Sequence, residues 1–367
     1  MAELDQINLS TRRYIRDNPK LVDNVFQNDP LLAYLKLNLR QDWDGGSLIQ
    51  ENFVYRNLIG GGYQKGKTFD GSERQVEQGF QIIPKTFEVG VTLAKEDIQV
   101  FNRGELAAFK LVDSRMTTAY MTMGAFLAIG QYLNGQANFI ANVNGLAEIC
   151  SDGTNNGFDG ATYATYGGIT RGGQTLNALK SPPINVNGTI EYNVLEESYG
   201  NTSFGNIEAN LGVTTVLGYS FIKEKFQTQQ RFNDTQDPAI GFNGLKFNSA
   251  TLIKSRYCPG TGSGGSATAD GIATAGTDAN LVAVDFLQQT TNGAVNAYPT
   301  VTGETLFWIQ AREPFLNFYV STDPEFGFGF TGFKPHQLNT SLVGQVLFAG
   351  NLTGHPRYQK QLFGITG

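Results

Sequence analysis

The sequence predicts a mixed α+β protein, and three stretches carry this prediction. Residues 104–133 place apolar side chains at steps of three and four residues, with one longer gap, which is the period of an amphipathic helix. Residues 41–85 contain alternating strand patterns on both sides of a tip rich in glycine and lysine, which is typical of a long β-hairpin. Residues 304–367 predict further strands, in TLFWIQAREPFLNFYVS and SLVGQVLFAGNLTG.

The composition favours a subunit that is covered by neighbours. The chain has 367 residues, which allows a large core and two or three domains. Hydrophobic residues make up 40% of the sequence and charged residues only 16%, a low share for an isolated soluble protein. The 26 phenylalanines and 15 tyrosines supply side chains that fill both cores and interfaces.

Charge and cysteine content narrow the class of protein. A net charge of −6 does not suit a protein that wraps DNA tightly, although one face can still lie against nucleic acid. Two cysteines do not make a disulfide framework, so we expect a reduced, intracellular origin. The first residues contain no apolar signal region, and no window of 18 apolar residues predicts a membrane span.

The first elements in chain order are short helices, a hairpin and a long helix. Residues 10–40 predict short helices broken by Pro19 and Pro30. The hairpin over 41–85 has many polar side chains and no core of its own, so we expect it to need a partner surface. The 30 residues of 104–133 would span about 45 Å as a helix, and Gly124 and Gly130 invite close packing or a bend.

The second half of the chain alternates helices and strands. Residues 189–232 show helical periodicity around a predicted buried strand with Leu211, Val213, Val216 and Leu217. Residues 240–258 alternate as strands do, and residues 260–280 form a low-complexity loop that we expect at the surface.

One motif points to a nucleotide. Residues Gly61–Thr68 fit the phosphate-loop pattern G-x-x-x-x-G-K-[ST], which works when a buried strand precedes it and a helix follows it. After Thr68 the sequence Phe-Asp-Gly-Ser predicts a turn, and no later strand ends in a magnesium-binding aspartate. The favoured interpretation is a hairpin tip that carries Lys65 and Lys67, and a P-loop nucleotide-binding protein stays as an alternative.

No other group of residues has the spacing of a catalytic or metal site. The histidines stand beside prolines, the cysteines lack C-x-x-C spacing, and the acidic pairs are explained by solvated helix starts and faces. We therefore predict no enzyme, no catalytic, cofactor-binding or metal residues, and no cofactor. The residues considered are His336, His355, Cys150, Cys258, Glu96–Asp97 and Glu196–Glu197.

Taken in order, several segments resemble the major capsid protein of tailed bacteriophages, which has the HK97-like fold. NPKLVDNVFQNDPLLAYLK resembles its N-terminal arm, and DWDGGSLIQENFVYRN leads into its extended loop (E-loop). VGVTLAKEDIQVFNRGELAAFKLVDSRMTTAYMTMGAFLAIGQYLNG is similar to the peripheral domain with its spine helix. TYGGITR, GFNGLKFNSATLIKSRYCP and GNLTGHPRYQKQLFGIT resemble parts of the axial domain and the C-terminal segment. The chain departs from the pattern at Gly172–Gln174, where relatives often have aromatic residues.

The resemblance implies a division of the chain. The expected parts are an N-terminal arm (1–45), an E-loop (46–86), a peripheral domain (87–145) with the spine helix 104–133, an axial domain (146–300) with a loop or insertion near 260–303, and return strands (301–367).

The resemblance also implies self-assembly into hexamers and pentamers of an icosahedral shell that encloses double-stranded DNA. The implied partners are other copies of the chain, a portal, a scaffold or decoration protein, and packaged DNA without sequence specificity, and no membrane. The implied location is the virion, after assembly in the host cytoplasm. We expect intersubunit contacts from Lys65, Lys67, Arg74 and Arg171. An encapsulin-like compartment shell shares the fold and is the main alternative; a β-rich tail or fibre protein fits less well, because of the long helix.

Overall fold

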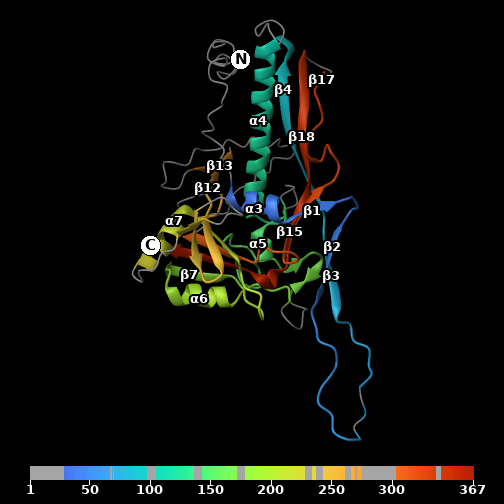
Figure 1. Ribbon diagram of the computed structural model, residues 1–367, viewed down its shortest axis with the longest axis vertical. Coiled ribbons are helices and arrows are strands. Elements are labelled where there is room, and N and C mark those ends of the chain that lie inside the picture. Colours follow the sequence, from blue (N-terminus) through green and yellow to red (C-terminus); the bar gives the residue numbers. More distant parts are fainter. Residues whose placement is uncertain are drawn as a thin grey trace.

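A computed structural model shows an elongated molecule with a long helix at one end and a thin hairpin at the other (Figure 1). Residues 1–28 of the expected arm, Lys67, Asp97, His336 and most of 260–303 lie outside the described residues. The described residues are 29–66, 68, 70–96, 105–135, 143–171, 178–227, 234–236, 243–260, 266–268, 271–274, 303–335 and 340–367.

One half of the body is a six-stranded sheet with a long helix against it. The strands are β1 (Arg40–Trp43), β4 (Lys85–Ala94), β15 (Leu316–Ser321), β16 (Gly327–Phe330), β17 (Lys334–Pro335) and β18 (Ser341–Gly354). The central strand is β18, which pairs antiparallel with β4 from Gly350↔Lys85 to Ser341↔Ala94. The short helix α3 (Pro30–Asn38) begins at Asp29, whose carboxylate accepts the Leu32 N–H at 2.9 Å, as the Asp-Pro pair predicts.

The long helix predicted from the periodicity is α4 (Glu105–Gly130), which lies along β4 and β18. Met123, Leu127 and Leu133 of the predicted apolar face are buried, whereas Tyr120 is 40% exposed. The helix ends three residues before the predicted boundary, because the last turn tightens: the N–H of Leu133 bonds to the carbonyl of Gly130 at 3.1 Å.

The end of α4 meets the second half of the body at a close backbone approach. A Cβ on Gly145 would lie 2.4–2.5 Å from the carbonyl oxygens of Gly130, Gln131 and Leu133. Only glycine fits there, and the next residue, Leu146, donates its N–H to the Gln131 carbonyl at 2.7 Å. This contact fixes where α5 (Leu146–Ile149) leaves the long helix.

The other half of the body is a seven-stranded mixed sheet with helices α6 (Tyr192–Gly200) and α7 (Val216–Gln227). Its strands, in spatial order, are β7 (Ile184–Thr189), β19 (Gln359–Thr366), β14 (Glu304–Ile309), β8 (Leu211–Thr214), β11 (Ala250–Lys254), β10 (Asn243–Phe247) and β9 (Asp234–Gln236). Two small ribbons, β5 (Thr165–Tyr166) with β6 (Ile169–Thr170) and β12 (Ser266–Thr268) with β13 (Gly271–Thr274), complete the described strands, apart from the hairpin strands described below.

The core of this half is organised by Trp308. Its indole N–H donates to Ser198 Oγ at 2.9 Å, and its ring stacks on Phe247 with centroids 5.4 Å apart. A Cβ on Gly212 of β8 would come within 2.6 Å of the ring, so the strand pair accommodates the indole only because residue 212 is glycine. The buried strand predicted from the sequence is confirmed for Leu211 and Val213, which lie in β8. It is wrong for Val216 and Leu217, which begin α7.

Candidate assembly surfaces

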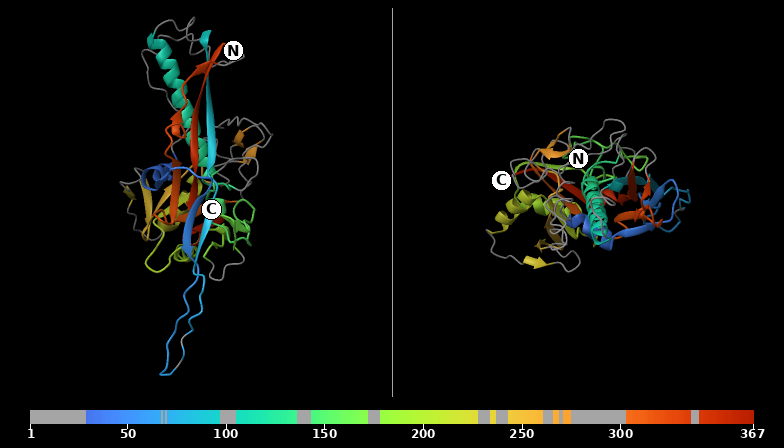
Figure 2. Two further views of the ribbon diagram at one scale, coloured as in Figure 1. Left: turned by 90° about the vertical axis from the view of Figure 1, so that its right-hand side faces the viewer. Right: turned by 90° about the horizontal axis from the view of Figure 1, so that it is seen from above.

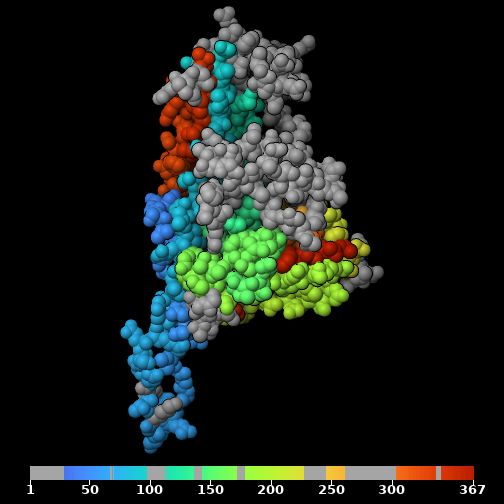
Figure 3. Space-filling view, turned by 180° about the vertical axis from the view of Figure 1, so that it is seen from behind, coloured from blue at the N-terminus to red at the C-terminus, as the bar shows by residue number. Residues whose placement is uncertain are grey.

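A two-stranded hairpin leaves the body and forms an isolated projection. Its strands β2 (Ile49–Val54) and β3 (Glu77–Ile82) pair antiparallel from Ile49↔Ile82 to Val54↔Glu77. Between them, the described residues of 55–76 form neither helix nor strand. Figure 1 and the left view of Figure 2, at right angles to it, show this segment extending away from the body, and the space-filling view shows it as a separate stalk (Figure 3). We call residues 55–76 the hairpin tip.

The hairpin tip has no core. None of its described residues is buried, and large apolar side chains on it and on the adjoining strand are open to solvent. These are Val54 (64% exposed), Leu58 (73%), Ile59 (44%) and Tyr63 (68%). A two-stranded ribbon is marginal in water without a surface to pack on, and grouped exposed apolar side chains mark interaction sites. The hairpin tip is therefore built to lie on another surface.

The root of the hairpin, in contrast, is anchored in an aromatic cluster. Phe80 of β3 is fully buried and its ring lies 5.1 Å from that of Tyr166, 5.3 Å from His355 and 6.0 Å from Phe53. Burial of a phenylalanine contributes about 1.5–3 kcal/mol. The hairpin is thus rigidly held at one end and unsupported at the other.

The TYGGITR segment holds this root in place. The Tyr166 hydroxyl donates to the Gly354 carbonyl at 2.8 Å and accepts the Gly354 N–H at 3.0 Å. The Gly167 carbonyl accepts the N–H of Gln81 at 2.9 Å, and a Cβ on Gly167 would lie 2.6 Å from that of Phe80. Gly167 also has a φ of +54°, so glycine is required for both its conformation and its contact with β3.

Arg171, which ends the TYGGITR segment, does not lie on the surface. Its side chain is 0% exposed and donates to the backbone carbonyls of Ser151, Leu179 (2.7 Å) and Glu148. The guanidinium carbon lies 5.1 Å from the centre of the Tyr166 ring. The expectation that Arg171 contacts another subunit is therefore corrected: its donors are turned inward, and it joins the loops around α5 to the segment that holds the hairpin.

Lys65 and Arg74 do lie on the hairpin tip, where Lys65 is exposed and Arg74 is half-buried. The phosphate-loop pattern falls on the same segment. A working phosphate loop needs a helix directly after the motif, and the described residues between the motif and β3 form none. The glycines form an extended tip rather than a phosphate cradle.

A carboxylate and an imidazole lie together beneath the hairpin root. Glu51 of β2 accepts hydrogen bonds from Asn317 Nδ2 (3.0 Å) and from the Thr353 hydroxyl, and its second oxygen lies 3.5 Å from Nε2 of His355. Burial lowers the pKa of His355, against the opposing effect of Glu51. Burial and the nearby Glu51 raise the pKa of Tyr319 to about 12. These groups tie the hairpin to strands β15 and β18.

His355 is expected to make the subunit less stable as the pH falls. Because its pKa in the folded chain lies below the ordinary value of 6.5, the unfolded chain takes up a proton first as the pH drops below 6.5. The free energy of unfolding should then fall by at most about 1.4 kcal/mol per pH unit from this group. Urea unfolding of His355→Gln and the unchanged chain from pH 8 to pH 5 measures it: the stability difference must shift in favour of the variant below pH 6.5. A constant difference would rule out a role for this imidazole.

Among the other residues considered from the sequence, Cys150, Cys258 and Glu196 lie in environments that are explained by the structure of the subunit. Burial raises the pKa of the Cys150 thiol to about 12 and that of Cys258 well above its usual value, so both are neutral thiols inside the core. Glu196 is exposed on α6 and accepts from Asn248 Nδ2 at 3.1 Å. Within the described ranges, no three metal-binding side chains gather, and no helix is long and apolar enough to cross a membrane.

The hairpin root was missed from the sequence. Its members, Glu51, Phe80, Tyr166 and His355, come from four segments, and no local spacing connects them. The one signal for this root in the sequence was the pair of glycines in TYGGITR, because Gly167 is where the backbone of this segment approaches that of β3.

Comparisons with known proteins agree with this architecture. No protein-family model matches the sequence, and neither does any curated protein. Solved structures match over nearly the whole chain. The capsid asymmetric unit of cyanophage A-1(L) has 12% sequence identity and a TM-score of 0.60, covering 95% of this chain and 96% of that one. The holo-SrpI encapsulin complex from Synechococcus elongatus PCC 7942 has 8% identity and a TM-score of 0.54, covering 96% and 95%. The mature capsid of bacteriophage PhiM1 has 8% identity and a TM-score of 0.52, covering 94% and 88%.

The likeness covers 94–96% of this chain. At 8–12% identity it is a likeness of fold. The mixed α+β class expected from the sequence is confirmed, and the chain has the HK97-like fold of phage major capsid proteins.

Proposed function

We propose that the chain is a major capsid protein that assembles into hexamers and pentamers of an icosahedral shell around double-stranded DNA. Its role is structural rather than catalytic, and its location is the virion after assembly in the host cytoplasm. The solved capsid structures with the same fold support this proposal.

The hairpin tip is the observation that carries the proposal. An arm with several exposed apolar side chains and a rigid root gains little within its own subunit. It can bury those side chains only on another molecule, and a second copy of the chain supplies the same surface in every subunit of a closed assembly. Lys65, Lys67 and Arg74 would meet acidic groups of the neighbour there, with Lys67 outside the described residues.

We further propose that the chain divides into the arm, the E-loop, the peripheral domain and the axial domain. The E-loop contains β2, β3 and the hairpin tip; the peripheral domain contains α4 and β4; the axial domain contains α6, α7 and most strands of the seven-stranded sheet. Gly45 and Gly46, with φ of +117° and +106°, stand where the hairpin leaves the body and are candidate hinges between symmetry environments. A portal and a scaffold or decoration protein are further proposed partners.

An encapsulin-like compartment is the second candidate, favoured by the likeness to the SrpI encapsulin complex. The two functions differ in what the shell encloses: a capsid holds packaged DNA, whereas a compartment holds protein cargo.

Electron microscopy and light scattering of the purified recombinant chain test the assembly itself. We expect closed shells, or rings of five and six subunits. Particles isolated from the native source then separate the two candidates, since nuclease-resistant double-stranded DNA indicates a capsid and a co-purifying enzyme indicates a compartment. A chain that stays monomeric, both alone and in extracts of its native source, would reject both.

A further inference from the structure

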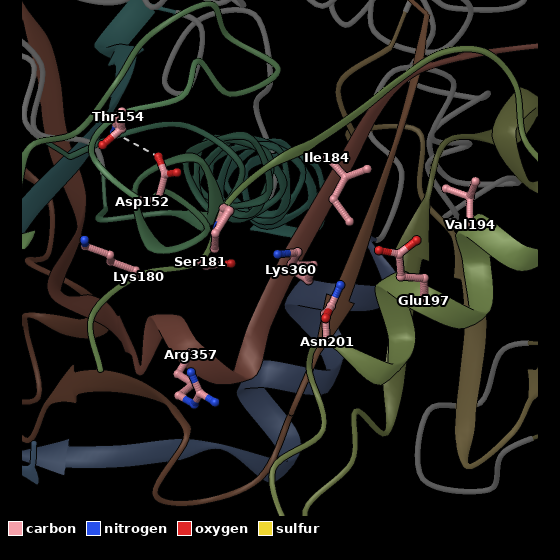
Figure 4. Close-up of a pocket in the computed structure, with 11 residues that line it drawn as sticks. Asp152, Thr154, Lys180, Ser181, Ile184, Val194, Glu197, Asn201, Arg357 and Lys360 are labelled. Atoms are coloured by element: carbon pink, nitrogen blue, oxygen red, sulfur yellow. Dashed lines mark hydrogen bonds between the residues drawn. The ribbon is translucent and has the colours of Figure 1, made fainter. Parts of the chain in front are cut away.

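A cleft in the half of the body with the seven-stranded sheet contains more positive than negative side chains. It has a volume of about 650 Å³, within the range typical of ligand sites, and lies between the loop after α5, the segment before β7, helix α6 and the turn before β19. Its lining residues include Lys180, Arg357 and Lys360, and two carboxylates, Asp152 and Glu197. Figure 4 shows Lys360 in the middle of this group, between Ser181 and Glu197.

Lys360 is the unusual member. Its side chain is only 7% exposed, yet the described residues provide it with neither a hydrogen bond nor an ion pair. Its ammonium nitrogen is not among the fully buried unpaired atoms, so the buried stem carries a charge that opens onto the cleft. Burial lowers the pKa of Lys360, and Cys150, Asp152 and Glu197 oppose this effect only in part.

None of these three neighbours forms an ion pair with Lys360. The Cys150 thiol, with a pKa of about 12, is neutral near pH 7. The Asp152 carboxylate accepts hydrogen bonds from the N–H groups of Thr154 (2.8 Å) and Asn155 (2.7 Å) and from the Asn155 side-chain amide (2.6 Å). These bonds hold the turn over residues 152–155. Glu197 is exposed on α6 and lies beyond ion-pair distance of the ammonium group. The charge of Lys360 is therefore left without a direct partner.

Two further cations border the same space. Lys180 is half-buried in the segment before β7, and Arg357 is exposed in the turn η3 (Pro356–Tyr358), where its guanidinium lies 4.7 Å from the Phe204 ring centre. Like Lys360, neither has an ion pair among the described residues. Because these three cations outnumber the two carboxylates of the lining, the cleft favours an anion with several oxygens over a metal cation.

We propose that this cleft binds a phosphate group, with Lys360 as the central ligand and Lys180 and Arg357 at its rim. A phosphate carries up to two negative charges and several acceptor oxygens, so it can satisfy more than one of these cations, whereas a carboxylate carries one charge. The phosphate can belong to a free phosphate or mononucleotide, or to a nucleic-acid strand. This site does not depend on the proposed assembly.

Isothermal titration calorimetry of the full-length chain at low ionic strength tests the site, because salt screens its exposed charges. The probes are inorganic phosphate, dAMP and a ten-nucleotide thymidine strand. We expect saturable binding at one site per chain. Lys360→Met, which keeps the length of the buried stem, should weaken the affinity at least tenfold. The control is Lys246→Met, at an exposed lysine on β10, which should leave the affinity within twofold.

The variants also separate folding from binding. Phosphate should raise the melting temperature of the unchanged chain but not that of Lys360→Met, since a ligand stabilises only the state that binds it. Arg357→Gln removes an exposed charge without disturbing the core and should weaken binding about threefold, so the test remains decisive if Lys360→Met does not fold.

The outcomes distinguish the sources of phosphate. Tighter Lys360-dependent binding of the thymidine strand than of phosphate indicates a nucleic-acid backbone, and binding of phosphate or dAMP alone indicates a free ligand. Acetate binding as tightly as phosphate would overturn the proposal in favour of a carboxylate, such as a side chain from another subunit. The absence of Lys360-dependent binding with every probe would overturn it altogether.

Discussion

A chain that carries Leu58→Asp and Ile59→Asp is expected to fold but to form no closed shells. Both side chains are exposed on the hairpin tip, so the substitutions leave the core of the subunit intact. In the proposed assembly these side chains are buried on a neighbour, where each contributes about 1.5–3 kcal/mol. A buried aspartate without a partner reverses this contribution, and the effect is repeated at every subunit.

Electron microscopy should show shells for the unchanged chain and free subunits or small oligomers for the double variant. Circular dichroism should be the same for both. The matched control is Leu58→Met with Ile59→Val, which keeps the surface apolar and should assemble normally. Shells of normal number and size from the aspartate variant would remove the hairpin tip from the assembly contacts.

Replacing Arg171 with methionine is expected to have the largest effect on folding. The guanidinium is fully buried and satisfies the carbonyls of Ser151, Leu179 and Glu148 at once. Methionine fills part of the volume but leaves the carbonyls of Leu179 and Glu148 without donors, whereas that of Ser151 still accepts the Ser181 N–H at 3.0 Å. Each buried orphan costs about 1–3 kcal/mol. Relief of the desolvation of the charge offsets only part of this loss, so we expect a net loss of about 3 kcal/mol or more in the free energy of unfolding.

Urea unfolding of unassembled subunits measures this loss. Arg312→Met, at an exposed arginine, is the control and should change the stability by less than about 0.5 kcal/mol. Arg171→Lys should fall between the two, because an ammonium group cannot reproduce the planar arrangement of the guanidinium donors. A stability of Arg171→Met equal to that of Arg312→Met would show that the carbonyls find other donors.

Local patterns predicted the elements that are amphipathic along their whole length. The helix over 104–133 was recognised because its buried face repeats every three to four residues, and α4 occupies most of that range. Alternation predicted strands on both sides of the hairpin tip for the same reason. Val216 and Leu217 were misassigned because a fully buried strand and the start of a helix have the same short apolar run.

Pairings between distant segments could not be predicted in this way. Arg171 was expected at an intersubunit contact, whereas the carbonyls that hold it come from α5, before it in the sequence, and from Leu179, after it. Lys360 was not considered from the sequence, because its burial follows from the packing of β19 beside β7 and α6. Such positions depend on tertiary structure rather than on local periodicity.

The long pairing of β18 with β4 has a mechanical consequence. The strands run antiparallel along the long axis of the molecule, and the chain continues from β18 through η3 into β19 of the other sheet. A stretching force along this axis loads the hydrogen bonds of the ladder in shear, so that many must break together rather than one after another. In the proposed shell, the body of the subunit would therefore resist a pull along this axis as one mechanical unit.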